Sequence, residues 1–475
     1  MQREKSKWRP HEDESTDMEH RGGVIRSSEE GAVMALERRD GIVQSGRMGQ
    51  PSVGMSSCCE TKSFSITKRQ VFDAYKKVKA NRGSAGIDRQ SLEDFNADLS
   101  RNLYKLWNRM ASGSYFPPPV LRVEIPKSGG GIRPLGIPTV ADRIAQMVVK
   151  DAIEPELEKC FHPDSYGYRP GRSAHQAVAT TRNRCWKRPW VLDMDIKSFF
   201  DTIDHELLMR AVRKHVREKW QCLYIERWLK ASVMHSDGRL EVRSVGTPQG
   251  GVISPLLANL FLHYAFDIWV ERNWPGIQFE RYADDIICHC ASEKEAEALK
   301  EVLTERFQSC GLTLHPEKTK IVYCKSSYHT GEYSEVSFDF LGYTFRPRLA
   351  RSRAGNKMVS FTPAISSKSA KRIRTSMRNW HLPCWQSLDI SEVAKNIWLR
   401  VQGWINYYGL FGISELRRVL YHLDEHIVRW IQRKYKKLRR RSKAFRWLRR
   451  VRKDNPCLFA HWRFRIEGGW TIGAV

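Results

Sequence analysis

The alternation of hydrophobic and polar positions changes character along the 475-residue chain. Residues 1–62 are polar and show no sustained apolar period, so we expect them to be disordered or loosely attached. From Thr67, the segment TKRQVFDAYKKVKAN has the apolar spacing of an amphipathic helix, which the glycines of RGSAGID would end. Helix-like and strand-like segments then alternate up to residue 345 and predict an α+β fold.

The two clearest strand-like segments are WVLDMDIKSFF and RYADDIICHC, which are rich in β-branched and aromatic residues. Beyond residue 346 the apolar residues take a heptad-like spacing through VAKNIWLRVQGWINYYGLF and LRRVLYHLDEHIVRWIQRKYKKL, which predicts an all-α bundle. The pattern therefore predicts three parts: an extension over residues 1–62, an α+β unit over 63–345 and a helical domain over 346–475.

Positive charge is concentrated in the last of these parts. The chain has 80 Lys and Arg against 53 Asp and Glu, a net charge of +27. Residues 346–475 hold 30 basic and 7 acidic residues, a net charge of +23. A segment this cationic implies a polyanionic partner. Trp and Tyr residues are interleaved with the Arg and Lys residues, so nucleic acid is favoured over a membrane surface, although many of these rings would equally serve as core.

The sequence lacks the patterns typical of a membrane span, a secretory signal or a zinc site. No run of about 18 apolar residues occurs, and the N-terminus has no apolar signal region. The 11 cysteines are scattered, without two pairs at the spacing of a zinc site. Cys288 and Cys290 share one face of a predicted strand, where they would pack as small hydrophobic residues. We therefore expect reduced thiols in a cytoplasmic protein.

Carboxylates gather in the two predicted strands. Asp284 and Asp285 precede the apolar run IIC, and adjacent carboxylates are costly to desolvate without a cation or a donor. Taken alone, the pair is typical of a solvated hairpin turn. In VLDMDIKSFFDTIDH, Asp193 and Asp195 would share one strand face, while Asp204 would cap the following helix. One strand carboxylate beside a hairpin that carries two predicts a pocket suited to Mg²⁺.

A further segment, EIPKSGGGIRPLGIP, has the composition of a phosphate-binding loop. Lys127 and Arg133 flank three glycines, which would let the backbone approach a phosphate. Alone, a lysine beside a glycine run is usually a solvated hairpin. Together with the carboxylates, the segment predicts a clamp for a nucleoside triphosphate. Two Mg²⁺ ions about 3.5–4 Å apart would then activate a 3′-hydroxyl and stabilise the leaving pyrophosphate.

Eight segments occur in an order that resembles the reverse-transcriptase blocks of group II intron-encoded proteins. They are GSAGID, IPKSGGGIRPLGIPTVADRIAQ, FHPDSYGYRPGRSAHQA, DMDIKSFFDTIDH, GTPQGGVISPLLANLFLH, RYADD, GLTLHPEKTK and FDFLGYTF. The later segments FTPAISSKSAKRIRTSMRNW and LRVQGWINYYGLF resemble the maturase domain, also called thumb and X, of the same family. The resemblance covers about residues 67–465.

The resemblance implies a right-hand polymerase fold, with fingers and an antiparallel palm sheet followed by a basic, all-α thumb and maturase domain. It implies an RNA-directed DNA polymerase that uses two Mg²⁺ ions and deoxynucleoside triphosphates, with catalytic carboxylates at Asp195, Asp284 and Asp285. The metal-binding positions are these three together with Ile196. The nucleotide-binding positions are Lys127, Arg133, Phe200, Gln249 and Lys318. The nucleic-acid-binding positions are Arg169, Arg172, Lys371, Arg372, Arg374 and Arg378.

Two of the nucleotide-binding positions have a structural alternative. The ring of Phe200 would leave no room for a ribose 2′-hydroxyl and so select deoxynucleotides. Alternatively, Phe199 and Phe200 would alternate between core and surface as ordinary packing. Lys318 would protonate the departing pyrophosphate or be a solvated loop lysine.

The glycine-rich loops have alternatives as well. Arg169 and Arg172 would contact the template backbone or be ordinary loop arginines. The glycines beside Gln249 would let the base pair of template and nucleotide approach closely, and they equally suit a loop that enters a helix at Ser254. The segment FDFLGYTF would grip the primer, and its alternation also fits a half-buried strand.

The expected partners are a group II intron RNA, an RNA template and a DNA primer or target, in the bacterial cytoplasm and at the nucleoid. The protein would assist splicing as a maturase and support intron mobility by reverse transcription. The chain ends without paired Cys-x-x-Cys or a nuclease-like pattern, as in family members without an endonuclease domain. Two alternatives are a splicing-only RNA-binding protein, which the intact carboxylates argue against, and a reverse transcriptase adopted by its host for repair or defence. A monomer and a homodimer fit equally.

Overall fold

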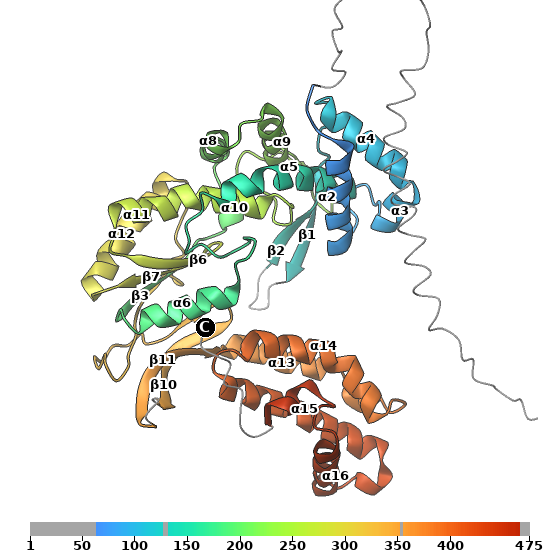
Figure 1. Ribbon diagram of the computed structural model, residues 1–475, viewed down its shortest axis with the longest axis vertical. Helices are drawn as coiled ribbons and strands as arrows, with labels where there is room; N and C mark the ends of the chain where they lie inside the picture. The colour runs from blue at the N-terminus through green and yellow to red at the C-terminus, as the bar shows by residue number, and fades with distance from the viewer. Residues whose placement is uncertain (1–62, 127–131, 352–354, 466–475) are drawn as a thin grey trace, which may run out of the picture. The chain divides into compact units, whose positions relative to one another are not determined.

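The computed structural model describes residues 63–126, 132–351 and 355–465, so the expectations for residues 1–62 and for Lys127 lie outside the described residues. The chain forms two compact units (Figure 1). The first contains the described residues up to Cys160 together with Phe200–Phe261, and the second contains Phe161–Phe199 and the described residues from Leu262 onward. Neither unit is one continuous stretch of sequence.

Helices dominate the first unit: α2 (Lys68–Asn81), α3 (Leu92–Ala97), α4 (Leu99–Ala111), α5 (Val140–Glu158), α8 (His205–His215), α9 (Lys219–Leu229) and α10 (Ser254–Leu262). The helix predicted after Thr67 is α2. It begins with a capping box, in which Thr67 accepts from the Gln70 main-chain N–H and the Gln70 side chain accepts from that of Thr67. Asp204 caps α8 as expected, because its Oδ1 accepts from the Leu207 main-chain N–H at 2.8 Å.

A small sheet accompanies these helices, in the strand order β2-β1-β4-β5. β1 (Val120–Pro126) and β2 (Ile132–Ile137) pair antiparallel along their whole length. β4 (Val233–Met234) and β5 (Leu240–Glu241) are short. The glycine-rich segment that was predicted to clamp phosphates therefore connects two paired strands, and its residues 127–131 lie outside the described part of the chain.

The second unit contains the predicted antiparallel palm sheet. Its strands are β6 (Gln278–Tyr282), β7 (Asp285–Cys290), β3 (Trp190–Asp195) and β8 (Lys320–Tyr323), in the order β6-β7-β3-β8. Every neighbouring pair is antiparallel. The strand predicted from WVLDMDIKSFF ends at Asp195, and RYADDIICHC contains the end of β6, a turn and β7.

The two faces of this sheet differ in chemistry. One face is apolar and lies under α12 (Glu293–Ser309), with buried side chains that include Leu192, Met194, Ile286 and Cys288. The other face carries Val191 and Ile287 under α6 (Ala174–Cys185), and toward one end it carries Asp195 and Asp285. Figure 1 shows α6 and α12 on opposite sides of the strands. The carboxylates therefore lie on a face with an apolar core at its other end.

A second antiparallel sheet in this unit consists of β9 (Phe338–Phe340), β10 (Tyr343–Arg351) and β11 (Lys357–Ile365). The expectation that the chain is all-α from residue 346 is corrected here, because β10 runs across residue 346 and β11 follows it. The segment FDFLGYTF is also two strands instead of one, since the chain turns at Leu341 and Gly342, with φ of +50° and +81°.

Helices form the remainder of the second unit: α13 (Ser367–Asn379), α14 (Ile390–Tyr408), α15 (Ile413–Lys434), α16 (Arg441–Asp454) and the 3-10 segment η5 (Ala460–Arg465). Trp430 and Trp462 are fully buried, and the rings of Trp380 and Trp404 stack with their centroids 5.4 Å apart. These tryptophans of the cationic part thus belong to the core. No helix in the described parts of the chain is long and apolar enough to cross a membrane.

Candidate functional site

Asp195 and Asp285 lie directly opposite each other at the ends of β3 and β7. Residues paired in this way have Cβ atoms about 4.5–5.5 Å apart, so their carboxylates share one small space. Asp284 belongs to the two-residue turn that joins Tyr282 to Asp285. The structure thus places Asp195 and Asp285 side by side, with Asp284 in the adjoining turn, although the two segments are far apart in the sequence.

The turn that carries Asp284 is strained and closely packed. Ala283 has φ +58°, in the left-handed region that residues with a Cβ disfavour. Gly167 lies so close to it that a Cβ at Gly167 would come within 2.4 Å of the Ala283 main-chain nitrogen. Only glycine fits at position 167 without displacing this turn.

A buried ion pair supports the same turn. Arg281 donates from Nε and Nη2 to the two carboxylate oxygens of Asp267 at 2.7 and 2.6 Å, and both side chains are fully buried. Its Nη1 donates to the Ala283 main-chain oxygen at 3.3 Å. Removing one partner of a buried pair is costly, because the other charge is left uncompensated. The sequence analysis missed both residues, although an arginine stands directly before the Tyr-Ala-Asp-Asp motif.

Burial and the closeness of the carboxylates to one another raise the pKa of two of them. Burial, and then the charges of Asp284 and Asp195, raise the pKa of Asp285 to about 7, while Lys318 lowers it. The pKa of Asp193, two residues before Asp195 on the same face, is raised well above its usual value, mainly by burial and then by Asp285 and Asp195. A site that disfavours its own negative charge is stabilised by a cation.

Lys318 supplies a positive charge beside this cluster. Its Nζ lies 2.6 Å from Oδ2 of Asp195, with 60% of the lysine and 29% of the aspartate side chain exposed. Lys318 is therefore a largely exposed loop lysine that contacts a candidate catalytic group. Its part in proton transfer stays a prediction.

The oxygen atoms of this site suit a hard cation, but they do not surround one completely. Among the described residues, no three His, Cys, Asp or Glu side chains are grouped closely enough to hold a metal ion alone. Asp195 and Asp285 offer carboxylate oxygens, and Ile196, whose side chain is buried, has only its main-chain oxygen to offer. Mg²⁺ is commonly held by one or two carboxylates together with water and substrate phosphates, so this open set fits that ion.

Two predicted nucleotide-binding residues meet in the first unit. Arg133 on β2 donates from Nε to Oε1 of Gln249 at 2.9 Å, and the Gly136 main-chain N–H donates to the Gln249 main-chain oxygen at 2.7 Å. Gly250 has φ +118°, and a Cβ there would come within 2.4 Å of the Gly136 oxygen. The close approach of the TPQGG loop to β2 therefore requires glycine.

Phe200 is joined to the same loop, because its main-chain oxygen accepts from the Thr247 N–H at 2.7 Å. The expected alternation of Phe199 and Phe200 between core and surface is wrong. The strand has already ended at Asp195, and both rings are buried in the short helix α7 (Phe199–Thr202), with 2% and 8% exposed. The steric role of Phe200 toward a ribose stays a prediction.

A buried relay behind this loop was missed by the sequence analysis. Gln146 Oε1 accepts from the Val252 main-chain N–H at 2.7 Å, and its Nε2 donates to Asp142 Oδ2 at 2.9 Å. Asp142 Oδ1 accepts from the Tyr115 hydroxyl at 2.8 Å and from Trp228 Nε1 at 2.7 Å. The available signal was an aspartate and a glutamine one helical turn apart in the apolar segment VADRIAQMVV. The carboxylate orients the Gln146 amide, and that amide holds the loop.

The predicted template contacts at Arg169 and Arg172 separate in the structure. Arg169 is buried, and its Nη1 donates to the main-chain oxygens of His162 and Ser165 at 2.7 and 2.8 Å. Its guanidinium also lies 5.2 Å from the centre of the Phe161 ring. Arg169 therefore holds its own loop together, which replaces the expected template contact. Arg172 is exposed.

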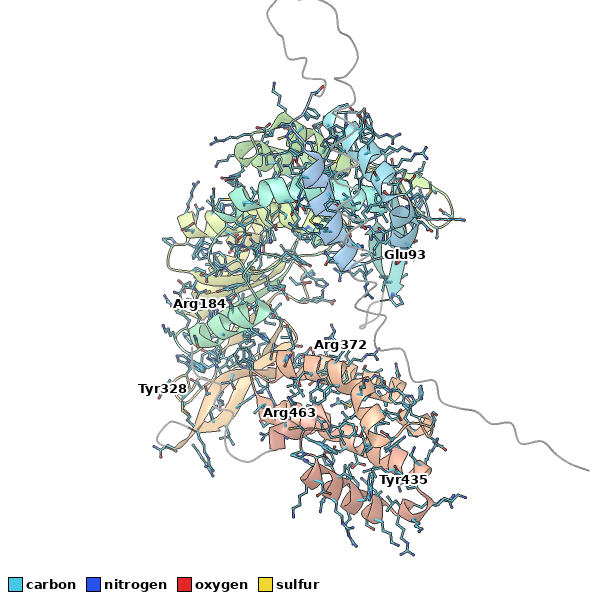
Figure 2. All side chains as sticks on the ribbon, turned by 45° about the vertical axis from the view of Figure 1, so that its right-hand side comes forward. Glu93, Arg184, Tyr328, Arg372, Tyr435 and Arg463 are labelled. Atoms are coloured by element: carbon cyan, nitrogen blue, oxygen red, sulfur yellow. The ribbon has the colours of Figure 1, made fainter. Side chains whose placement is uncertain are left out.

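The other predicted contacts lie on α13. Its buried stripe includes Ile373 and Met377. Arg372, which is labelled in Figure 2, is exposed. Its Nη2 donates to the Tyr408 hydroxyl at 3.1 Å. The remaining basic residues are exposed or half-buried around the stripe: Lys371, Arg374 and Arg378. The helix therefore presents several cations to solvent, as a phosphate-binding surface requires.

Cys288 and Cys290 are packed in the core as small hydrophobic side chains, as expected, and both are fully buried. Their neighbour His289 points to the opposite face of β7, where its Nε2 lies 2.7 Å from Glu280 Oε2. Glu280 also accepts from Arg184 Nη1 at 2.5 Å. This buried network fixes β6 and β7 relative to α6.

Two family models match the chain. The model described as "Reverse transcriptase (RNA-dependent DNA polymerase)" matches residues 125–345, and "Group II intron, maturase-specific domain" matches residues 370–450. Protein YkfC of Escherichia coli is 34% identical over 330 residues, which are 62% of this chain and 82% of YkfC.

Two intron-associated proteins are also similar to the chain. Group II intron-encoded protein LtrA of Lactococcus lactis is 35% identical over 40% of this chain and 32% of LtrA. An uncharacterized 91 kDa protein in the cob intron of Schizosaccharomyces pombe is 31% identical over 73% of this chain and 50% of that protein. The matched part of this chain thus spans half or less of these two relatives.

A solved telomerase structure from Candida albicans aligns with 76% of this chain and 67% of that chain, at 12% identity and a TM-score of 0.44.

Proposed function

Because the chain belongs to the reverse transcriptases, the RNA-dependent DNA polymerases, and carries a group II intron maturase-specific domain, we propose how it works and what it binds. It copies an RNA template onto a DNA primer with two Mg²⁺ ions at Asp195, Asp284 and Asp285, and it binds a group II intron RNA. The observation that supports the catalytic site best is the register of β3 and β7, which sets Asp195 opposite Asp285 beside the Asp284 turn.

The carboxylates and Lys318 act at the reacting end of the primer. When bound, the two Mg²⁺ ions would activate the primer 3′-hydroxyl and stabilise the leaving pyrophosphate. Asp195 and Asp285 offer oxygens from two rigid strands, so little reorganisation accompanies binding. Lys318, in contact with Asp195, is our candidate to protonate the pyrophosphate.

The first unit supplies the nucleotide contacts. Arg133 offers a guanidinium to the triphosphate, and Gln249, held by Arg133 and by β2, lies beside the incoming base. Phe200, tied to the same loop through its carbonyl, excludes a ribose 2′-hydroxyl. We assign these roles by the resemblance of the motifs and by the contacts that join the three residues.

The intron RNA is the partner that the charge distribution fits. Residues 346–475 carry a net charge of +23, and α13, most of which lies in the maturase-specific match, exposes several cations. Intron RNA and a DNA primer occur together in the bacterial cytoplasm and at the nucleoid, where we place the activity. A splicing-only protein would have no need for the paired carboxylates.

Asp284→Ala tests the catalytic assignment. We expect dNTP incorporation on an RNA template with Mg²⁺ to fall at least about a thousandfold, because transition-state charge loses its counterion site. Affinity for a group II intron RNA, and promotion of its splicing, should stay within about twofold of wild type. Primer extension with dNTPs and with rNTPs, RNA binding and a splicing assay measure these effects.

The control is Glu297→Ala, which removes an exposed carboxylate from α12 and should leave all activities intact. Polymerisation that survived Asp284→Ala would overturn the site assignment. A wild type that promoted splicing but never extended a primer would establish the splicing-only alternative.

A further inference from the structure

A groove of about 420 Å³ lies between α15 and α16, in the C-terminal helical part of the second unit. Figure 1 shows these two helices next to each other. The groove is lined by three arginines of α16, by three aromatic rings and by three other side chains: Arg446, Arg449, Arg452, Tyr421, Phe445, Trp462, Asp424, Ser442 and Leu448. Its volume lies within the range of small-ligand sites.

The arginines make this groove unusual. Arg446, Arg449 and Arg452 follow one another at a spacing of three residues, so they share one face of α16. The buried residues of α16 are the apolar Ala444 and Leu448, and Arg446 and Arg449 are exposed beside them. Between Lys436 and Lys453, 11 of 18 residues are Lys or Arg and none is Asp or Glu. The lining also includes the carboxylate of Asp424, so it carries three cations and one anion, and a bound anion would offset the remaining excess of positive charge.

The wall of the groove is rigid and aromatic. Trp462 is 1% exposed, and its Nε1 donates to Asp424 Oδ1 at 2.9 Å. The same oxygen lies 2.8 Å from His461 Nε2. Arg452 Nη2 lies 3.3 Å from the Trp462 main-chain oxygen. This network ties η5 to both helices.

Two further rings are accessible at its mouth. Tyr421 is 44% exposed and Phe445 is half-buried, so each can offer a ring face or edge to a ligand. Arg441 lies 5.4 Å from the centre of the Phe445 ring and pairs with Glu425 at 2.7 Å. Rings beside several arginines are the combination that binds a single nucleotide, by stacking on its base and pairing with its phosphate.

We propose that this groove binds one unpaired nucleotide of an RNA. The base lies against Phe445 and Tyr421, and its phosphates contact Arg446, Arg449 and Arg452. The inference rests on the proposed function only in taking RNA as the partner. A fully paired duplex offers phosphates but no free base, so it would use the cations without filling the groove.

The test compares two RNA hairpins that differ by one bulged adenosine in the stem. Fluorescence anisotropy gives Kd for each with the full chain at one fixed salt concentration. We expect wild type to prefer the bulged hairpin at least about tenfold. Phe445→Leu keeps an apolar side chain and removes the ring, and it should reduce the preference to about twofold or less.

A pair of arginine variants separates the groove from general charge. Arg449→Ala should weaken binding of the bulged hairpin most and abolish the preference. Arg450→Ala removes the same charge one position further along α16, outside the groove, and should weaken both hairpins about equally while the preference remains. Thermal melting of Phe445→Leu and Arg449→Ala shows whether each variant is folded.

Three results would overturn the inference: equal binding of both hairpins by wild type, a preference that both groove variants retain, or a loss in Arg450→Ala as large as in Arg449→Ala. Failure of the proposed function is distinguishable. A wild type that extended primers and bound both hairpins equally would refute the groove alone, whereas one that bound neither hairpin would refute the RNA-binding function itself.

Discussion

Gly167 and Asp142 each act on the candidate site through one close contact without belonging to it. Gly167 confines the turn that carries Asp284, and Asp142 orients the amide that holds the TPQGG loop. In both cases a rigid neighbour sets the position of a functional group. The consequence of a substitution is therefore a displacement of the site, in addition to any loss of folding stability.

Gly167→Ala should displace the turn. The added Cβ would lie within 2.4 Å of the Ala283 nitrogen, so the turn and Asp284 must move. Because a misplacement of about 1 Å can reduce a rate about 100-fold, we expect kcat for dNTP incorporation to fall by about that factor. The Mg²⁺ concentration for half-maximal rate should rise. Primer extension across a Mg²⁺ titration measures both quantities.

Gly276→Ala is the matched control, since a Cβ there meets nothing within 4 Å. Its rate should stay within about twofold of wild type. If Gly167→Ala were as active as Gly276→Ala, the packing of Gly167 would not determine where the turn lies.

Asp142→Asn should loosen the TPQGG loop. The carboxylate accepts from Tyr115, Trp228 and Gln146, and an amide would set an NH₂ group against one of these donors. A buried donor left without an acceptor costs about 1–3 kcal/mol. We expect KM for dNTP to rise about 5- to 100-fold with a smaller change in kcat, measured by steady-state primer extension.

Asp142 should also make the free energy of unfolding depend on pH, and Asp142→Asn should remove this dependence. Burial raises the pKa of Asp142 from 3.8 to about 6. The folded state therefore binds this proton more tightly than the unfolded state, and the stabilisation present below pH 4 is lost as the pH rises through about 6. The shift corresponds to on the order of 3 kcal/mol. The Tm advantage of wild type over Asp142→Asn should shrink between about pH 4.5 and pH 7, and a growing advantage would contradict the assignment.

The helices and strands that were predicted correctly are those whose signal lies within a short stretch of sequence. Thr67 before α2, the alternation along β3 and the hairpin in RYADD are each visible within a dozen residues. FDFLGYTF contains β9 and the start of β10, but the rest of β10 and the whole of β11 were not predicted. Each of these two strands contains a proline, which argues against a strand. Pro347 is tolerated because β9 pairs with β10 only as far as Phe345, so beyond that point β10 has a neighbour on one side only.

The residues of the candidate site also fall into a group that could be predicted from a short stretch of sequence and a group that could not. Asp195, Asp284 and Asp285 could be predicted because the carboxylates stand in recognisable motifs. Their supports could not, because each support is a contact between distant segments: Gln146 reaches a residue 106 positions away. Likewise, nothing local shows that Arg169 turns inward, since its acceptors are main-chain oxygens of a folded loop.

The cations of α13 should contribute part of the affinity for RNA. Reversing the charge of Arg372, Arg374 and Arg378 to Glu removes three cations around its buried stripe. Each lost phosphate contact should reduce the slope of log K against log salt by about 0.7–0.9, so we expect a slope lower by about 2 and weaker binding of intron RNA. Filter binding across a salt series measures both.

The control for α13 is the same reversal on one face of α4, at its exposed residues Arg101, Lys105 and Arg109. This control should change the slope less. An unchanged slope after reversal on α13 would show that its cations do not contact phosphates.

At the scale of the whole molecule, charge and catalysis are distributed differently. Residues 346–475 carry a net charge of +23, which leaves +4 for the first 345 residues. Asp195, Asp284 and Asp285 all lie in those first 345 residues. Each compact unit also combines separate stretches of sequence, so a simple truncation would remove part of a unit's core. Salt can separate the two activities where truncation cannot.

Raising KCl from about 50 to 200 mM should weaken RNA binding about a thousandfold, if 6 or more phosphates are contacted. The rate of one dNTP addition on a saturated complex should change less than about threefold, because half-buried carboxylates paired across β3 and β7 are screened less than exposed side chains. Anisotropy measures the affinity and rapid-quench primer extension measures the rate. A rate that fell in parallel with affinity would place the dominant charge interaction at the catalytic carboxylates, and the cationic helices would then have another role.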